Sequence, residues 1–320
     1  MKEIKRLIQP ELTAFEDKFA AAVKSRIPLL DRIMHYIVKR KGKQIRPMFV
    51  FLSAKLAGSV TETTYRTAAL VELLHTATLV HDDVVDDADQ RRGRFSINAL
   101  WKNKIAVLVG DYLLSKGLLL SLDNSDFEIL RILSTAVKEM SEGELLQIEK
   151  TRKLDIEESV YFNIIRSKTA SLLAASCAAG AYSSSNDPDI SRRMHDFGQK
   201  VGIAFQIKDD LFDYGSQKIG KPTGIDIREK KMTLPLIYTL QKVDKSTRRH
   251  LIYIVKNQGH KKEKVDEVIQ CVINNGGIAY AEAKMQNYQQ EAFELLHSFP
   301  DSPIRAGLEQ LVRFTTERVY

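Results

Sequence analysis

The stretch His81-Asp82-Asp83-Val84-Val85-Asp86 places aspartates at positions i, i+1 and i+4 of a helix predicted over residues 64–87. Side chains four residues apart lie one above the other on a helix, so Asp82 and Asp86 would project together. The same spacing returns more than a hundred residues later in Asp209-Asp210-Leu211-Phe212-Asp213. Like charges at this spacing cost a helix about 0.2–0.5 kcal/mol, which a bound cation would offset. We therefore expect these two aspartate clusters to face each other and to hold hard divalent cations.

The sequence around the clusters favours an all-α protein. None of the eight prolines lies between Pro47 and Pro188, so a long stretch lacks the residue that breaks helices. Apolar residues recur at spacings of three and four in the row Leu70, Leu73, Leu74, Ala77 and Val80. We find no sustained alternation of the kind that strands show. We expect one domain over residues 1–320, built from about ten or more helices.

Composition limits the other function classes. The 320 residues are 44% hydrophobic, which is enough for a sizeable core. Two cysteines are too few for a disulfide framework, and the N-terminus lacks the apolar segment of a signal peptide. We see no apolar run of about 18 residues, so no membrane-spanning helix is expected. These features together favour a cytoplasmic protein.

The net charge of +7 suits anionic partners such as nucleic acid, an anionic membrane surface or phosphorylated substrates. Basic residues are spread along the chain in short runs, typical of solvated faces, so nucleic-acid binding is not expected. Two basic groups do stand near predicted helix ends. Lys43 and Arg46 precede Pro47, where orphan N–H groups favour an anion. Arg91 and Arg92 follow the first cluster, where they would either neutralise the helix end or grip a diphosphate.

Two further lysine-bearing segments leave a structural and a functional interpretation open. Lys168 and Thr169 open an apolar helix of small residues, and Lys168 would need an anionic partner there. The segment 215–235 after the second cluster is rich in glycine and lysine. It would be a flexible surface loop or an active-site flap. The apolar helix predicted over residues 104–122 would lie in the core or at a subunit contact.

Together these motifs resemble the trans-type isoprenyl (polyprenyl) diphosphate synthases, long-chain branch, over roughly residues 20–320. The motifs that carry the resemblance are Gly42-Lys43-x-x-Arg46-Pro47, Glu72-Leu73-Leu74-His75, both aspartate clusters, Arg91-Arg92-Gly93, Lys168-Thr169, Phe205-Gln206 and Gly220-Lys221-Pro222-x-Gly224-x-Asp226. The resemblance implies the isoprenoid synthase fold, a helical bundle around a central active-site cavity. It also implies a homodimer formed through the helix near residues 104–122, and peripheral membrane association for product release.

The resemblance also implies a role for each site residue. Two or three Mg²⁺ ions would be held by Asp82, Asp83, Asp86 and Asp209, with Asp210 and Asp213 supporting. The allylic diphosphate would be bound by Arg91, Lys168, Lys208 or Lys221, and Lys231. Isopentenyl diphosphate would be bound by Lys43, Arg46, His75 and Arg92. Thr169 and Gln206 would stabilise an allylic carbocation, which the isopentenyl double bond attacks before a proton is lost to the released diphosphate.

Product length follows from two small residues. Ala77 and Thr78 lie five and four positions before Asp82, about 6–8 Å deeper along the helix. In the family that the chain resembles, aromatic residues at this depth are typical of the short-product enzymes, so the small residues here predict a long product, about C30 to C45. Three alternatives remain. They are a short-chain farnesyl or geranylgeranyl diphosphate synthase, a metal phosphohydrolase that uses His81-Asp82, and an inactive regulatory subunit of a heteromeric synthase.

Overall fold

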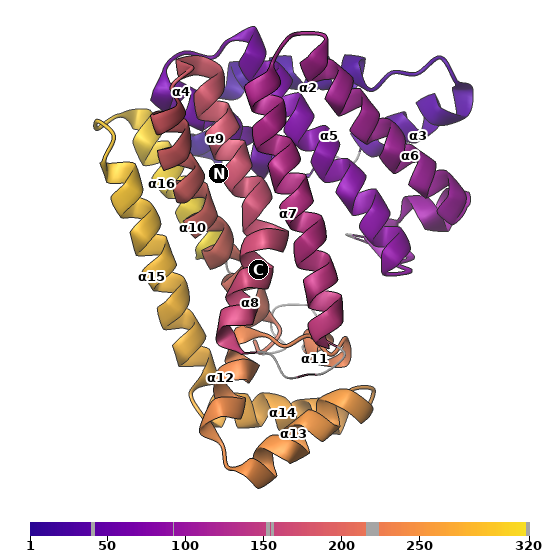
Figure 1. The fold of residues 1–320 in the computed structure, drawn as a ribbon, viewed down its shortest axis with the longest axis vertical. Helices are drawn as coiled ribbons and strands as arrows, with labels where there is room; N and C mark the ends of the chain where they lie inside the picture. The colour runs from indigo at the N-terminus through magenta and orange to yellow at the C-terminus, as the bar shows by residue number, and fades with distance from the viewer. Residues whose placement is uncertain (40–41, 92, 152–153, 155–156, 216–223, 318–320) are drawn as a thin grey trace. The chain divides into compact units, whose positions relative to one another are not determined.

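The computed structural model describes residues 1–39, 42–91, 93–151, 154, 157–215 and 224–317, apart from the side chains of Lys2 and Arg91 (Figure 1). The described chain is helical except for a two-stranded antiparallel hairpin, β1 (Gln90–Arg91) with β2 (Arg94–Phe95). Gly93 in the turn has a φ of 71°, which glycine adopts without strain. The all-α prediction is therefore confirmed.

The chain forms two compact units, each made of several segments. The first unit comprises Met1–Val137, Ala175–His195 and Phe299–Leu308. The second comprises Lys138–Ala174, Asp196–Ser298 and Glu309–Tyr320. The two aspartate clusters belong to different units, so their facing each other stays a prediction. The organisation of residues 1–320 as one domain likewise stays a prediction.

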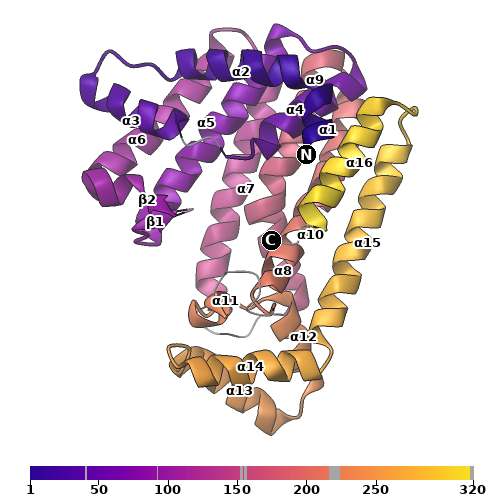
Figure 2. The ribbon, with the colours of Figure 1, turned by 180° about the vertical axis from the view of Figure 1, so that it is seen from behind.

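The first unit is built around a long pair of helices. Its elements are α1 (Lys2–Leu7), α2 (Gln9–Ala22), α3 (Pro28–Val38), α4 (Ile45–Ala57), α5 (Glu62–Val85), the hairpin β1–β2, α6 (Ile97–Leu122), the start of α7 (Phe127–Thr151), most of α9 (Ser171–Ser185) and the starts of α10 (Pro188–Phe212) and α16 (Pro303–Thr316). Helices α5 and α6 lie side by side in both views (Figures 1 and 2). A capping box begins α5, because the Thr61 side chain accepts from the Thr64 N–H and Thr64 reciprocates.

Glycines on α6 let the two helices approach closely. A Cβ at Gly110 would stand 2.1 Å from the His81 imidazole, and one at Gly117 would stand 2.7 Å from Leu70. Both glycines lie on one face of α6, since seven residues make about two helical turns. His81 and Leu70 therefore lie on the face of α5 that packs against α6.

The second unit carries the second aspartate cluster. Its elements are the end of α7, α8 (Glu158–Ile165), the π-helix η1 (Arg166–Ala170), the start of α9 (Ser171–Ser185), most of α10 (Pro188–Phe212), α11 (Ile225–Arg228), α12 (Leu234–Lys242), α13 (Lys245–Asn257), α14 (Lys262–Asn274), α15 (Gly277–His297) and the end of α16 (Pro303–Thr316). Gly202 on α10 brings that helix against Ala170, whose Cα would stand 2.5 Å from an added Cβ. This close approach places Thr169 beside the helix that bears the second cluster.

Helix α6 has a kink at Lys102, whose φ is 73°. The part after the kink agrees with the helix predicted over residues 104–122. Several large apolar side chains of this part are exposed, among them Leu108 at 56% and Leu119 at 52%. In the described part of the chain, α6 alone is long and apolar enough to cross a membrane, judged by length and composition. One such helix is weak support for a span, because a core helix passes the same test, so the absence of a membrane-spanning helix stays a prediction.

Candidate active site

The three carboxylates of the first aspartate cluster differ in exposure. Asp83 is only 4% exposed, whereas Asp82 is half-buried and Asp86 is exposed. The Asp86 N–H donates to the Asp82 carbonyl at 2.8 Å, so the helical geometry continues to the end of the cluster. Asp82 and Asp86 therefore lie on one side of α5, as their spacing predicts.

The His81 side chain packs between α5 and α6 and does not lie on the side of α5 that carries Asp82 and Asp86. Its Nε2 lies 3.3 Å from the Val107 carbonyl oxygen and 3.5 Å from the Asp111 carboxylate, both on α6. The ring occupies the hollow that Gly110 leaves open. No group of three or more His, Cys, Asp or Glu side chains stands ready as a metal cage in the described residues. The alternative of a phosphohydrolase that uses His81-Asp82 as a metal doublet gains no support from these contacts.

Two predicted isopentenyl diphosphate ligands meet in the first unit. Arg46, in the first turn of α4, donates from Nη1 to Nε2 of His75 on α5 at 2.9 Å. Arginine is always a donor, so the His75 Nε2 must be unprotonated in this pair. Lys43 is exposed just before α4. Arg92 and the side chain of Arg91 lie outside the described residues.

The three carboxylates of the second aspartate cluster differ in burial. Asp210, 5% exposed, accepts from the Tyr161 hydroxyl at 2.7 Å, the Gln206 amide at 3.0 Å and the Leu234 N–H at 3.5 Å. Asp213 accepts from the N–H groups of residues 225 and 226, at 2.7 Å and 3.2 Å. Asp209 is only half-buried. The bound carboxylates thus anchor the segment after the cluster.

Burial raises the pKa of these acids. It brings the pKa of Asp210 to about 6, although the bonds from Tyr161 and Gln206 oppose the rise. Burial, and then the nearby Asp210 charge, raise the pKa of Asp226 to about 7. The pKa of Asp213 is also raised, chiefly by burial. The charges of Asp210, Asp213 and Asp226 therefore repel one another, and a nearby cation would lower their pKa values.

Thr169 and Gln206 are joined in one hydrogen-bonded chain. The Thr169 hydroxyl donates to Gln206 Oε1 at 2.8 Å, and Gln206 Nε2 donates onward to Asp210 at 3.0 Å. This chain uses both ends of the Gln206 amide, whereas the Thr169 oxygen keeps its lone pairs. Thr169 is therefore the better placed of the two to present an oxygen dipole to a cation.

The predicted diphosphate-binding lysines already have carboxylate or aromatic neighbours. Lys168 forms an ion pair with Glu144 and reaches the Gln147 amide at 3.4 Å. Lys231 pairs with Glu229 at 2.5 Å and with Asp226 at 3.9 Å. Lys208 lies 5.2 Å from the centre of the Phe212 ring, and Lys221 lies outside the described residues. Lys168 therefore has an anionic partner within the protein, Glu144, in the place where the sequence led us to expect a substrate diphosphate.

The two predicted chain-length residues lie on different faces of α5. Thr78 is four residues from Asp82 and three from His75, so these three share one face, and Thr78 is half-buried. Ala77 is fully buried and shares the face of Leu70 and His81, which packs against α6. Of the pair, Thr78 is therefore the residue on the side of the aspartates.

Sequence reasoning missed two partners of this site. Tyr161 on α8 is buried and holds Asp210, and Glu144 on α7 neutralises Lys168. A tyrosine or a glutamate on an amphipathic helix carries no local signal for such a role. Gly143 beside Glu144 offers a weak one, because its missing Cβ would stand 2.9 Å from the Lys168 backbone nitrogen.

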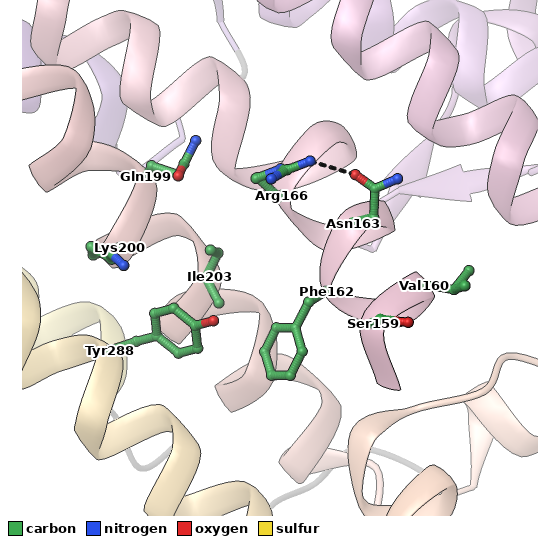
Figure 3. Close-up of a pocket in the computed structure, with 9 residues that line it drawn as sticks. All are labelled: Ser159, Val160, Phe162, Asn163, Arg166, Gln199, Lys200, Ile203 and Tyr288. Carbon is green, nitrogen blue, oxygen red and sulfur yellow. Dashed lines mark hydrogen bonds between the residues drawn. The ribbon is translucent and has the colours of Figure 1, made fainter. Parts of the chain in front are cut away.

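A cavity of about 600 Å³ opens in the second unit between α8, η1, α10 and α15 (Figure 3). Arg166 lines it and donates to Asn163 at 2.6 Å, and the rings of Phe162 and Tyr288 lie 5.6 Å apart beside it. None of the predicted site residues lines this cavity. It is therefore separate from the hydrogen-bonded chain at Asp210.

We expect Tyr161→Phe to destabilise the metal-free protein by about 1–3 kcal/mol at pH 8, because the buried Asp210 carboxylate loses a donor. At pH 5 the loss should be smaller, since Asp210 is then mostly protonated. Urea unfolding at both pH values measures the difference. Tyr182→Phe, on α9, is the control, and an equal loss at the two pH values would contradict this explanation.

The raised pKa values also predict how stability depends on pH. An unfolded aspartate titrates near pH 4, whereas folded Asp210 and Asp226 titrate near about 6 and about 7. Between the pKa of an unfolded aspartate and the raised pKa values of Asp210 and Asp226, the folded state keeps protons that the unfolded state has released. The free energy of unfolding therefore falls as the pH rises through this range. We expect the metal-free protein to lose about 2–4 kcal/mol between about pH 5 and about pH 8. Asp226→Asn should flatten the profile, and a stability that rises with pH would overturn it.

Comparisons with known proteins agree with this set of motifs. Residues 27–272 match the family model "Polyprenyl synthetase". Octaprenyl diphosphate synthase of Haemophilus influenzae is 32% identical, with 99% of this chain and 97% of that protein covered. Heptaprenyl diphosphate synthase component 2 of Bacillus subtilis is 32% identical, with 98% and 89% covered.

Solved structures are similar over the whole chain. A decaprenyl diphosphate synthase from Rhodobacter capsulatus superposes with a TM-score of 0.94 at 33% identity, covering 100% of this chain and 99% of the other. A polyprenyl synthase from Caulobacter crescentus, complexed with calcium and isoprenyl diphosphate, has a TM-score of 0.90 at 31% identity, covering 99% and 97%. A geranylgeranyl pyrophosphate synthase from Bacteroides thetaiotaomicron has a TM-score of 0.84 at 38% identity, covering 99% and 98%.

Proposed function

This chain belongs to the polyprenyl synthetase family, and we propose that it extends an allylic diphosphate head-to-tail with several isopentenyl diphosphates. The product would be a long-chain all-trans polyprenyl diphosphate. One observation carries this proposal: the similarity to long-chain polyprenyl diphosphate synthases covers nearly the whole of both chains. The small residues at positions 77 and 78 favour the long-chain branch over the short-chain enzymes.

A divalent cation fits the donors of this chain. Carboxylate oxygens are hard ligands, and Mg²⁺ is usually bound by one or two carboxylates together with substrate phosphate oxygens. Asp82 and Asp86 lie on one side of α5, and Asp209 is the carboxylate of the second cluster that is not deeply buried. We propose that these residues and Asp83 hold two or three Mg²⁺ ions, which neutralise the departing diphosphate when they are bound. Asp210 and Asp213 would support the site through the backbone and side chains that they bind.

The other residues of the chain would bind and orient the two substrates. The Arg46–His75 pair presents guanidinium and imidazole groups from neighbouring helices, which suits the diphosphate of isopentenyl diphosphate. Lys168 would exchange part of its Glu144 contact for the allylic diphosphate. The Thr169 hydroxyl oxygen, fixed through Gln206, would stabilise positive charge on the allylic carbon. The proton lost after condensation would pass to the released diphosphate.

Mass spectrometry of the product tests this function. The purified chain alone would receive farnesyl diphosphate, isopentenyl diphosphate and Mg²⁺. A product of about C30 to C45 supports the proposal, because such a chain would have to grow past position 78. A C20 product would favour the geranylgeranyl alternative. A chain that makes no product alone, but gains activity with a second subunit, would favour the heteromeric alternative.

We also propose that a second copy of the chain covers the exposed apolar face of α6. Val107, Leu108, Leu118 and Leu119 are all exposed and recur after eleven residues, or about three turns, so they form one stripe. A variant with Leu108→Glu and Leu119→Glu should sediment as a monomer, while the parent protein sediments as a dimer. Ile273→Glu, an exposed apolar position on α14, is the control. A double variant that remains dimeric would contradict this assignment.

A further inference from the structure

A basic segment without acidic residues covers α13 and the turn that follows it. Residues 245–262 contain six Lys or Arg and no Asp or Glu, whereas the whole chain has a net charge of only +7. The rest of the protein is therefore close to neutral. A local excess of this size creates a surface field that attracts anionic partners.

The exposed side chains of α13 form one stripe. Lys245, Arg249, Tyr253 and Lys256 are spaced by four, four and three residues, so they share one helical face. All four are exposed, Tyr253 at 53%. The opposite face of the helix carries Leu251, Ile254 and Val255, which are buried in the core of the second unit. We call Lys245, Arg249, Tyr253 and Lys256 the α13 stripe.

The cations of this surface are not neutralised by the protein. Within the described residues, no carboxylate forms an ion pair with Lys245, Arg249 or Lys256, nor with the exposed Lys261 and Lys262 of the following turn. Nearby acids are used elsewhere, since Glu267 pairs with His250 and Lys264, each at 2.6 Å. Asp244 caps α13 by accepting from the N–H groups of residues 246 and 247. The positive charge of the stripe thus faces solvent.

We propose that the α13 stripe docks the protein on an anionic lipid bilayer. The helix presents a convex ridge of cations, which suits a planar anionic surface better than the basic groove that single-stranded nucleic acid follows. Tyr253 lies at the centre of the stripe, and a tyrosine has an apolar ring and a polar tip, as interfacial side chains do. Long lysine and arginine side chains can rest on the interface while their charges reach the headgroups.

Docking would deliver the water-insoluble product to the membrane, a purpose that rests on the proposed function. The docking itself rests only on charge, exposure and helix geometry. Figures 1 and 2 both show α13 beside α14, beyond the start of α15. The stripe holds none of the residues assigned to substrate or metal binding, so docking and catalysis can be measured separately.

Vesicle co-sedimentation of the full chain tests the proposal. The vesicles would be phosphatidylcholine alone or phosphatidylcholine with phosphatidylglycerol at low salt. The parent protein should bind only the anionic vesicles. A triple variant, Lys245→Gln with Arg249→Gln and Lys256→Gln, should lower the partition coefficient about 100-fold, since each cation contributes about fivefold. Tyr253→Ser should also weaken binding to the anionic vesicles, because the interfacial ring is lost.

The matched control removes three charges from other helices, through Arg131→Gln, Lys138→Gln and Arg192→Gln. This control should lower the partition coefficient by no more than about fivefold, which is the effect of removing one cation next to the membrane. Equal losses in both triple variants, or unchanged binding in the stripe variant, would overturn the proposal. Stripe-dependent binding of a single-stranded RNA oligomer without vesicle binding would also overturn it. Condensation of a short soluble primer should be unchanged in the stripe variant. If condensation is absent even in the parent, the proposed function fails while the docking result still stands.

Discussion

Asp82→Asn is expected to lower kcat for isopentenyl diphosphate incorporation about 10³-fold, since metal and electrostatic stabilisation of a leaving group supplies several kcal/mol. The half-buried Asp82 carboxylate lies on the same side of α5 as Asp86, where it can serve as a metal ligand. An asparagine there keeps the shape of the side chain but loses its negative charge. The fold should be intact, because Asp82 lies in the last turns of α5 and is only partly buried. Steady-state incorporation of labelled isopentenyl diphosphate at saturating Mg²⁺ measures the effect.

Asp87→Asn is the matched control for this variant. Asp87 is exposed in the same turn and has a φ of 49°, a left-handed conformation that asparagine also tolerates. We expect its activity to stay within about twofold, because Asp87 is outside the proposed ligand set and an exposed charge interacts only weakly through water. If both variants lost activity equally, a general field effect would explain the result and the ligand assignment of Asp82 would fail.

Thr78→Phe is expected to shorten the main product from about C30–C45 to about C15–C20. Thr78 shares the face of Asp82 and His75 and lies about 6 Å along the helix from Asp82. A phenylalanine there would leave room for little more than the starting allylic chain. Product chromatography and mass spectrometry read the change directly. Turnover of short primers should persist, because no diphosphate or metal ligand is altered.

Ala77→Phe should behave differently, although the neighbouring residues Ala77 and Thr78 were predicted to have the same role in setting product length. Ala77 is fully buried on the face that packs against α6, so a phenylalanine would overpack the pair of helices. We expect a loss of about 1–3 kcal/mol in the free energy of unfolding, or more. Thermal unfolding measures this cost. A stable Ala77→Phe protein with shortened product would show that the growing chain passes on that side of α5, and would contradict the division between the two residues.

The helical elements were predictable because their signals are local. The i, i+4 aspartates, the row of apolar residues before them and the scarcity of proline define α5 within two residues of its observed bounds. Asparagine and glycine at 274–277 and prolines at 300 and 303 are local signals of the same kind, and they coincide with the end of α14 and the start of α16. Exposure of the α6 leucines was not predictable, because a helix that is apolar over most of its circumference looks the same in a core and at an uncovered face.

The sequence by itself determined the fold class, the family and the positions of the acidic and basic motifs that we propose for the reaction. Periodicity, residue chemistry and motif order are properties of the chain and survive without coordinates. Tertiary structure decided how these residues are used. The second cluster has three chemically identical aspartates, yet Asp210 and Asp213 are bound by Tyr161, Gln206 and backbone N–H groups, while Asp209 is only half-buried. Burial and hydrogen-bond partners come from segments distant in sequence, and for this reason the spacing of aspartates alone does not distinguish a metal ligand from a structural anchor.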